Sequence, residues 1–325
     1  MDKATYTYSQ LSSDSVLKMV LRHYNFTKII HCKFYLLGLH DNYLISADDD
    51  HQYVLRIYRN DWRSQKEILF ELEVLTFLGS QGAAVSAPLP TKRGEFSFMI
   101  DCPEGLRSAT LFAYAEGHAP CNEITVEEST LLGRTVATIH NISEPLSITA
   151  NRPVLETPYL LDESLRTIEP FVGLSTFSYL KTLQQSLKAA LPPLARKRGI
   201  YGICIGDVNP TNFHINKNNH ITIFDFDQCG YGFRAFEIGK FISSIHAVKL
   251  KQAISRAFID GYQEIRPLTT DEIASIPYYE MISVIWVMAI HACNADRIGY
   301  KWLEKPFWDR HIAKLKTLES VAIKQ

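Results

Sequence analysis

Three oxygen-bearing side chains, Asp207, Asn212 and Asp225, are spaced so that they could bind a metal ion together. Two short apolar runs around a polar, asparagine-rich stretch occupy residues 213–224, a pattern typical of a β-hairpin. If its turn centres near Asn218, Asn212 lies across from the residue before Asp225, and cross-strand Cβ atoms are about 4.5–5.5 Å apart. Asp207 precedes Asn212 by five residues and can loop back to the same point. Carboxylate and amide oxygens are ligands for Mg²⁺ with bound phosphates, so the spacing predicts such a site.

The region that must hold this hairpin is otherwise rich in helix signals. Thr125 with Glu128, and Thr269 with Glu272, are capping boxes, so a helix is expected to begin at each. The second box precedes the most apolar stretch of the chain, residues 282–293, which is interrupted by polar residues. That stretch is too short to span a bilayer.

The first third of the chain is dominated by strand signals. Apolar runs separated by turns predict strands at 34–37, 43–45, 53–58, 96–100 and 110–114, and helical spacing of apolar residues predicts a helix at 67–78, ending at Gly79. In the third strand Arg56 lies between Leu55 and Ile57, so its side chain points to the opposite face. A small sheet-rich part is therefore followed by a larger helical part that carries one hairpin.

The string Gly206-Asp207-x-x-x-x-Asn212, followed by Phe224-Asp225-Phe226-Asp227, resembles the catalytic segment of the aminoglycoside phosphotransferase and choline kinase-like family. Residues 224–234 and 286–295 look closest to the branch that holds type II homoserine kinases and bacterial stress-response kinases. The resemblance covers most of the chain. It implies an α+β, protein kinase-like bilobal fold, with an N-terminal nucleotide-binding lobe at 1–113, containing an antiparallel sheet and one helix. A larger, mostly helical catalytic and substrate-binding lobe at 114–325 would carry the hairpin.

The same resemblance implies roles for the residues that carry the chemistry. Asp207 would orient and deprotonate the acceptor hydroxyl, and Asn212 and Asp225 would hold Mg²⁺ on the phosphates of ATP. Arg56 occupies the position where protein kinases carry a phosphate-pairing lysine, and Glu71 would be its ion-pair partner. Arginine in place of lysine keeps the charge and can bind phosphate through two hydrogen bonds.

Further nucleotide contacts follow from the resemblance. The loop from Gly38 to Asn42 would cover the phosphates, and a hinge that includes Phe112, Tyr114 and Glu116 would meet adenine with its backbone.

The motif defines the residues that contact the phosphate acceptor less well than those that bind the nucleotide. Asp227, Tyr231 and Arg234 are the candidates for substrate contacts, although Asp227 could equally stabilise its own loop. The family usually has histidine two residues before the catalytic aspartate, and this chain has Ile205 there. A histidine would brace the loop through a hydrogen bond, whereas Ile205 can only pack.

The predicted function is ATP- and Mg²⁺-dependent transfer of the γ-phosphate to a hydroxyl of a small molecule, such as an amino alcohol, amino sugar or aminoglycoside. Two alternatives stay open. A Ser/Thr protein kinase of the stress-response type is one, because acidic and basic residues are mixed beyond Gly261 and do not define the acceptor. A nucleotide-binding pseudokinase is the other, and only Ile205 favours it.

Composition excludes several other classes of protein. The 325 residues contain 34 Lys and Arg against 35 Asp and Glu, a formal net charge of −1, so neither nucleic acid nor an anionic membrane is an expected partner. The six cysteines form no CxxC pair and are expected to be reduced. The polar N-terminus lacks the apolar run of a signal peptide, so a cytoplasmic protein is expected. The sequence leaves the oligomeric state open.

Overall fold

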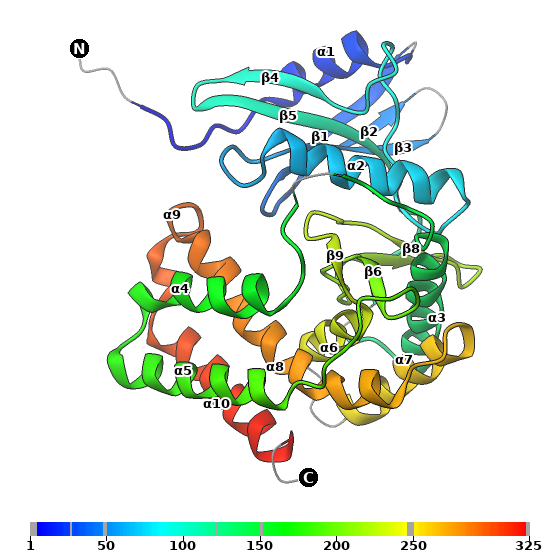
Figure 1. Ribbon diagram of the computed structural model, residues 1–325. Helices are drawn as coiled ribbons and strands as arrows, with labels where there is room; N and C mark the ends of the chain where they lie inside the picture. Colours follow the sequence, from blue (N-terminus) through cyan, green and yellow to red (C-terminus); the bar gives the residue numbers. More distant parts are fainter. Residues whose placement is uncertain are drawn as a thin grey trace. The chain divides into compact units, whose positions relative to one another are not determined.

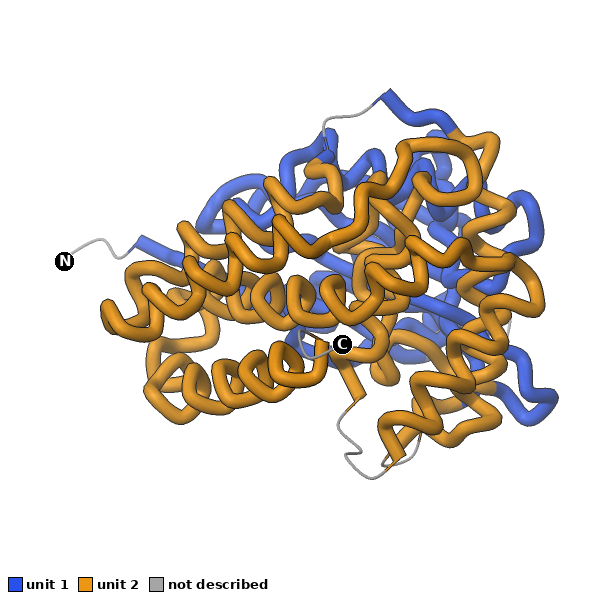
Figure 2. The backbone as a smooth tube through the Cα atoms, turned by 60° about the horizontal axis from the view of Figure 1, so that its bottom comes forward, with its two compact units in different colours: residues 1–117, 147–152, 216–224 blue, residues 118–146, 153–215, 225–325 orange. Residues whose placement is uncertain are grey.

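The computed structural model describes residues 5–26, 28–47, 51–120, 123–149, 152–245 and 250–322 (Figure 1). The chain forms two compact units (Figure 2). Unit 1 comprises residues 1–117, 147–152 and 216–224, and unit 2 comprises 118–146, 153–215 and 225–325. The lobe boundary expected between residues 113 and 114 stays a prediction.

Unit 1 is built on a five-stranded antiparallel sheet with the order β1-β2-β3-β5-β4. Its strands are β1 (Ile29–Leu37), β2 (Asp41–Ala47), β3 (Gln52–Ile57), β4 (Phe98–Cys102) and β5 (Gly105–Ala113). Each strand expected from the sequence overlaps one of these. The turn between β1 and β2 contains only residues 38–40, because Asn42 already pairs with Arg56 across β2 and β3. The prediction that Asn42 belongs to this loop is wrong, because Asn42 is a residue of β2.

Among the described residues of unit 1 there are two helices, one more than the sequence predicts. Helix α2 (Gln65–Ser80) begins at a capping box of Ser64 and Glu67, and it buries Ile68, Leu72 and Leu75 at helical spacing. The unexpected helix is α1 (Ser13–His23), whose Val16 and Val20 are fully buried in one hydrophobic core with the sheet. Helix α1 is amphipathic, with Val16 and Val20 buried and Leu17 and Leu21 partly buried against the same core, so its apolar spacing was a signal that the sequence analysis did not use.

Unit 2 is mostly helical. Its helices are α3 (Val126–Ile142), α4 (Ser164–Ile168), α5 (Leu174–Ala190), α6 (Arg234–Ser244), α7 (Lys251–Ile265), α8 (Thr270–Cys293), α9 (Ala295–Ile298) and α10 (Lys305–Ala322), with a π-helix at Pro158–Glu163 and short 3-10 helices at Glu169–Phe171 and Tyr300–Leu303. Both capping boxes form, at the N-termini of α3 and α8. Helix α8 supplies much of the core and packs against α4, α6 and α10.

Helix α8 is longer than the apolar stretch seen in the sequence, so the expectation that this segment is too short for a membrane is wrong by length. The helix runs for 24 residues and continues through Pro277 in its interior. Among the described residues it is the one helix long and apolar enough to cross a membrane, but 67% of its apolar window is buried inside the protein. Such burial is typical of a core helix.

Two small sheets complete the structure. Strands β6 (Tyr201–Cys204) and β9 (Gly230–Phe233) pair antiparallel in unit 2. Strands β7 (Phe213–Ile215) and β8 (Ile221–Ile223) form the second pair, and Asn216 closes their turn by donating its N–H to the carbonyl of His220 at 3.0 Å. The hairpin predicted from the sequence is therefore present.

Candidate active site

Asp207 lies in the loop between β6 and β7, and both of its carboxylate oxygens have partners. Oδ1 is 2.6 Å from the Nζ atom of Lys240, and Oδ2 accepts a hydrogen bond from Nδ2 of Asn212 at 3.0 Å. The Lys240 side chain is 4% exposed, whereas that of Asp207 is 30% exposed. The carboxylate is therefore held at two points while part of it stays accessible to a substrate.

The amide of Asn212 is oriented by the same loop. Its Nδ2 atom also donates to the main-chain oxygen of Asp207 at 3.0 Å, so the nitrogen side of the amide faces Asp207. Among the described residues, its oxygen, Oδ1, has a single 3.5 Å contact with the hydroxyl of Thr211, which is too long for a strong hydrogen bond. An amide oxygen presented in this way fits a metal ligand.

Asp225 lies two residues after the end of β8 and adopts a left-handed backbone conformation, with φ of 65°. Few residues other than glycine take this conformation, and Asp and Asn are among those that tolerate it. Backbone strain of this kind often occurs at functional sites. Asp227, two residues further, is 2% exposed and accepts a hydrogen bond from Gln228 Nε2 at 3.2 Å. This bond supports the expectation that Asp227 stabilises its own loop.

The segment just before Asp207 is held by a side chain that sequence reasoning missed, Glu237 on α6. Its carboxylate accepts the main-chain N–H of Gly206 at 2.9 Å and that of Ile205. Burial raises the pKa of Glu237 to about 7, and the two backbone hydrogen bonds oppose this rise. Gly206 has φ of 87°, and a Cβ there would lie 2.1 Å from the carbonyl oxygen of Gln228, so only glycine fits.

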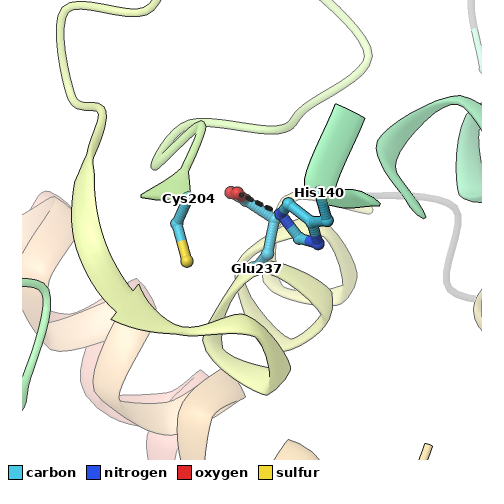
Figure 3. Close-up of side chains that lie close together, drawn as sticks. All are labelled: His140, Cys204 and Glu237. Carbon is cyan, nitrogen blue, oxygen red and sulfur yellow. Dashed lines mark hydrogen bonds and ion pairs between the residues drawn. The ribbon is translucent and has the colours of Figure 1, made fainter. Parts of the chain in front are cut away.

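A buried polar cluster surrounds Glu237 (Figure 3). His140 of α3 places Nε2 3.4 Å from the Glu237 carboxylate, and its Nδ1 lies 2.8 Å from the hydroxyl of Tyr262. Burial and two nearby arginines lower the pKa of His140 well below its usual range, and burial raises that of Cys204. The ligand atoms of His140, Cys204 and Glu237 lie within 4.8 Å of one another. A metal ion there would have to displace the bonds that hold the loop, so the cluster fits a structural support better than a metal site.

In unit 1, Arg56 and Glu71 form the ion pair that the sequence predicts. The Nη1 atom of Arg56 is 3.1 Å from Glu71 Oε1, and the hydroxyl of Tyr58 donates to the other oxygen at 3.2 Å. The guanidinium carbon lies 5.4 Å from the ring centre of Phe112, within cation–π range. Glu71 is completely buried and Arg56 is 9% exposed. These contacts hold the arginine in one place on β3.

A pocket of about 590 Å³ lies in unit 1, lined by the end of β2, the start of β3 and the residues Ala113, Tyr114, Glu116 and Gly117. This volume is typical of small-molecule pockets, and Tyr114 and Glu116 are among its lining residues. Phe112 and Arg56 do not line it. Gly38 lies in the short β1–β2 turn, where its N–H donates to the carbonyl of His40 at 3.1 Å.

The other two acceptor candidates lie in unit 2. Tyr231 stacks on Tyr201, with ring centres 6.4 Å apart, and donates its hydroxyl to the carbonyl of Leu146 at 3.3 Å. Arg234 is completely buried, and its guanidinium pairs with Glu144 at 2.9 Å. This burial favours a structural role for Arg234, so its substrate contact stays a prediction without support from the geometry.

The fold is that of the kinase-like phosphotransferases. Residues 32–268 match the family model APH, the phosphotransferase enzyme family, and the chain belongs to this family. An uncharacterized protein of Synechocystis sp. is 36% identical over 317 residues, covering 96% of this chain and 87% of that protein. The finer placement in the homoserine kinase and stress-response kinase branch stays a prediction.

Two solved structures share the fold at low sequence identity. One is the amicoumacin kinase hAmiN in complex with AMP-PNP, Ca²⁺ and Ami, with a TM-score of 0.77, 20% identity, and coverage of 96% of this chain and 93% of that chain. The other is a microcompartment-associated aminopropanol kinase, with a TM-score of 0.77, 22% identity, and coverage of 96% and 97%. The expected kinase-like fold and phosphotransferase class are thereby confirmed.

Proposed function

We propose that this protein transfers the γ-phosphate of ATP, with Mg²⁺, to a hydroxyl of a small amine-bearing molecule such as an amino alcohol, amino sugar or aminoglycoside. The observation that carries the proposal is the loop around Asp207. A carboxylate that is fixed at both oxygens yet 30% exposed can accept a proton from a bound hydroxyl, and Asn212 turns its amide oxygen away from that carboxylate.

Phosphoryl transfer passes through a loose transition state, so the protein contributes mainly positioning and neutralisation of charge. Asn212 and Asp225 would hold the metal ion, which neutralises phosphate charge when bound. Arg56, fixed by Glu71, would pair with phosphate oxygens. Asp207 would orient the acceptor hydroxyl and take its proton as the new O–P bond forms.

The comparisons support a small-molecule acceptor. Both similar structures are kinases named for small molecules, and aminopropanol is an amino alcohol. The structure also weakens the main reason for a pseudokinase. Ile205 cannot brace the loop with its side chain, but the backbone N–H groups of Ile205 and Gly206 are held by Glu237 instead.

The test is a screen for ADP release by the purified chain with ATP and Mg²⁺. The acceptors are aminopropanol, choline, homoserine, glucosamine, spectinomycin and a generic protein substrate, with Asp207→Asn and omission of Mg²⁺ as controls. We expect one small-molecule class to raise ADP release at least about tenfold over water, a gain within reach of a single general base. Stimulation by the protein substrate alone, or by nothing in the panel, would contradict the proposal.

A further inference from the structure

Lys240 is a buried lysine whose ammonium group contacts the predicted catalytic base. It lies on α6, three residues after Glu237, in a run from Arg234 to Ser243 in which every residue is buried. Lysine is almost never buried unless it is paired. Here the partner is Asp207, at 2.6 Å, and Lys240 as a whole is only 3% exposed.

The two contacts on Asp207 have different consequences for its geometry. Asn212 holds Oδ2 from within the loop, whereas Lys240 holds Oδ1 from a separate helix. One contact would leave the carboxylate able to turn about its Cβ–Cγ bond, and the second fixes its plane. A displacement of about 1 Å at a reacting group can cost on the order of 100-fold in rate.

We infer that Lys240 is a positioning residue for phosphoryl transfer, which fixes the plane of the Asp207 carboxylate so that it faces the acceptor hydroxyl. The inference rests on the proposed function. Helix α6 thereby holds the loop at two points, since Glu237 binds the backbone before Asp207 and Lys240 binds the side chain of Asp207. Neither residue belongs to the Asp207–Asn212–Asp225 motif.

A purely structural lysine would give a different result from a positioning lysine. If Lys240 only balanced buried negative charge, its loss would lower stability and leave the turnover of the folded enzyme unchanged. If it positions Asp207, its loss lowers kcat of the folded enzyme and leaves the KM for ATP nearly constant, because ATP is assigned to other residues.

The experiment compares Lys240→Met with Lys314→Met in the full chain, using the most active acceptor of the panel. Lys314 on α10 is the control, since it is partly buried and donates to the carbonyl of Ser243 on the same α6. We expect Lys240→Met to lose about 10–100-fold in kcat with the KM for ATP within about threefold. Lys314→Met should stay within about twofold. If Lys240→Met does not fold, Lys240→Gln takes its place with the same expectation.

Chemical rescue separates charge from packing. Lys240→Ala removes the equivalent of propylammonium, so added propylammonium should restore at least about tenfold in kcat, and propan-1-ol of similar shape should not. Equal rescue by both compounds, or an unchanged kcat in folded Lys240→Met beside an active wild type, would overturn this inference alone. A wild type inactive on every acceptor would overturn the proposed function and this inference with it.

Discussion

At the scale of single residues, some atoms around Asp207 hold its carboxylate and loop in place, and others remain available to react. Lys240 and the amide nitrogen of Asn212 hold the carboxylate, and Glu237 holds the backbone before it. The accessible part of the Asp207 carboxylate and the amide oxygen of Asn212 remain available for chemistry. Substitutions that keep the shape of these groups therefore test their chemistry separately from the fold.

Asp207→Asn keeps the shape of the side chain and removes the proton acceptor. Because general base catalysis contributes roughly 10²–10⁴-fold, we expect kcat to fall within that range. The affinity for Mg·ATP, measured by calorimetry, should change little. A large loss of affinity with an unchanged rate for the bound complex would show that Asp207 is a metal ligand instead.

Ile205→His tests whether the loop needs the histidine that the family resemblance implies at this position. Ile205 is 1% exposed, and the loop is already held through its backbone by Glu237. A histidine would have to bury its ring nitrogens there, which costs about 1–3 kcal/mol if they find no partner. We expect kcat no higher than wild type and a lower midpoint of urea unfolding. A silent wild type that becomes active on this substitution would identify a natural pseudokinase.

At the scale of elements, α6 is the helix that connects the loop to the core of unit 2. Its charged residues Arg234, Glu237 and Lys240 recur every three positions in an otherwise apolar, buried segment. Each has a fixed partner, in Glu144, the loop backbone and Asp207 respectively. Charges in a helix of this kind are a sequence signal that a structural or catalytic contact lies beyond the helix itself.

Glu237→Gln should change how stability depends on pH. Burial raises the pKa of Glu237 from 4.5 to about 7, so the folded protein binds this proton more tightly than the unfolded chain. That stabilisation is complete below about pH 4.5 and is lost as the pH rises through about 7. The unfolding free energy of wild type minus that of Glu237→Gln should therefore fall by roughly 3 kcal/mol between pH 4.5 and 8. Urea unfolding at both pH values measures this, and a constant difference would contradict it.

Helices α3 and α7 approach closely at two glycines. A Cβ on Gly133 would lie 2.2 Å from the carbonyl oxygen of Phe258, and one on Gly261 would lie 2.2 Å from that of Thr130. Gly261→Ala must push the helices apart, so we expect a loss of about 1–3 kcal/mol in unfolding free energy. Gly173→Ala is the control, since nothing lies within 4 Å of its added Cβ. Equal stability of the two variants would show that the helices separate without cost.

At the scale of the whole molecule, the elements that could be predicted from the sequence are those that local residue patterns determine. The five strands, α2, both capping boxes and the hairpin follow from periodicity and turn residues close together in the chain. The pair of Arg56 and Glu71 came from a family resemblance and is present. The charges on α6 indicate contacts beyond the helix, but the partners of Glu237 and Lys240 could not be assigned from the sequence. Those partners lie in the loop around Asp207, about 30 residues away along the chain.

Mg·ATP should stabilise the chain, because a ligand that binds only the folded state shifts the unfolding equilibrium toward that state. A ligand at 100 times its dissociation constant adds about 2.7 kcal/mol to the unfolding free energy. We expect Mg·ATP to raise the thermal midpoint of the wild type, and Arg56→Gln in unit 1 and Asp225→Ala in unit 2 each to abolish that increase. Arg56→Gln leaves the buried Glu71 without its cation, so its unliganded midpoint should fall, and the increase on adding Mg·ATP is measured from that lower value.

Arg256→Gln is the control for this measurement, since Arg256 is 75% exposed and pairs only on the surface of α7 with Asp260. Its response to Mg·ATP should equal that of the wild type. If Asp225→Ala removed the increase while Arg56→Gln kept it in full, nucleotide binding would depend on unit 2 alone. The phosphate-pairing role of Arg56 would then be wrong, and its ion pair with Glu71 would serve only the stability of unit 1.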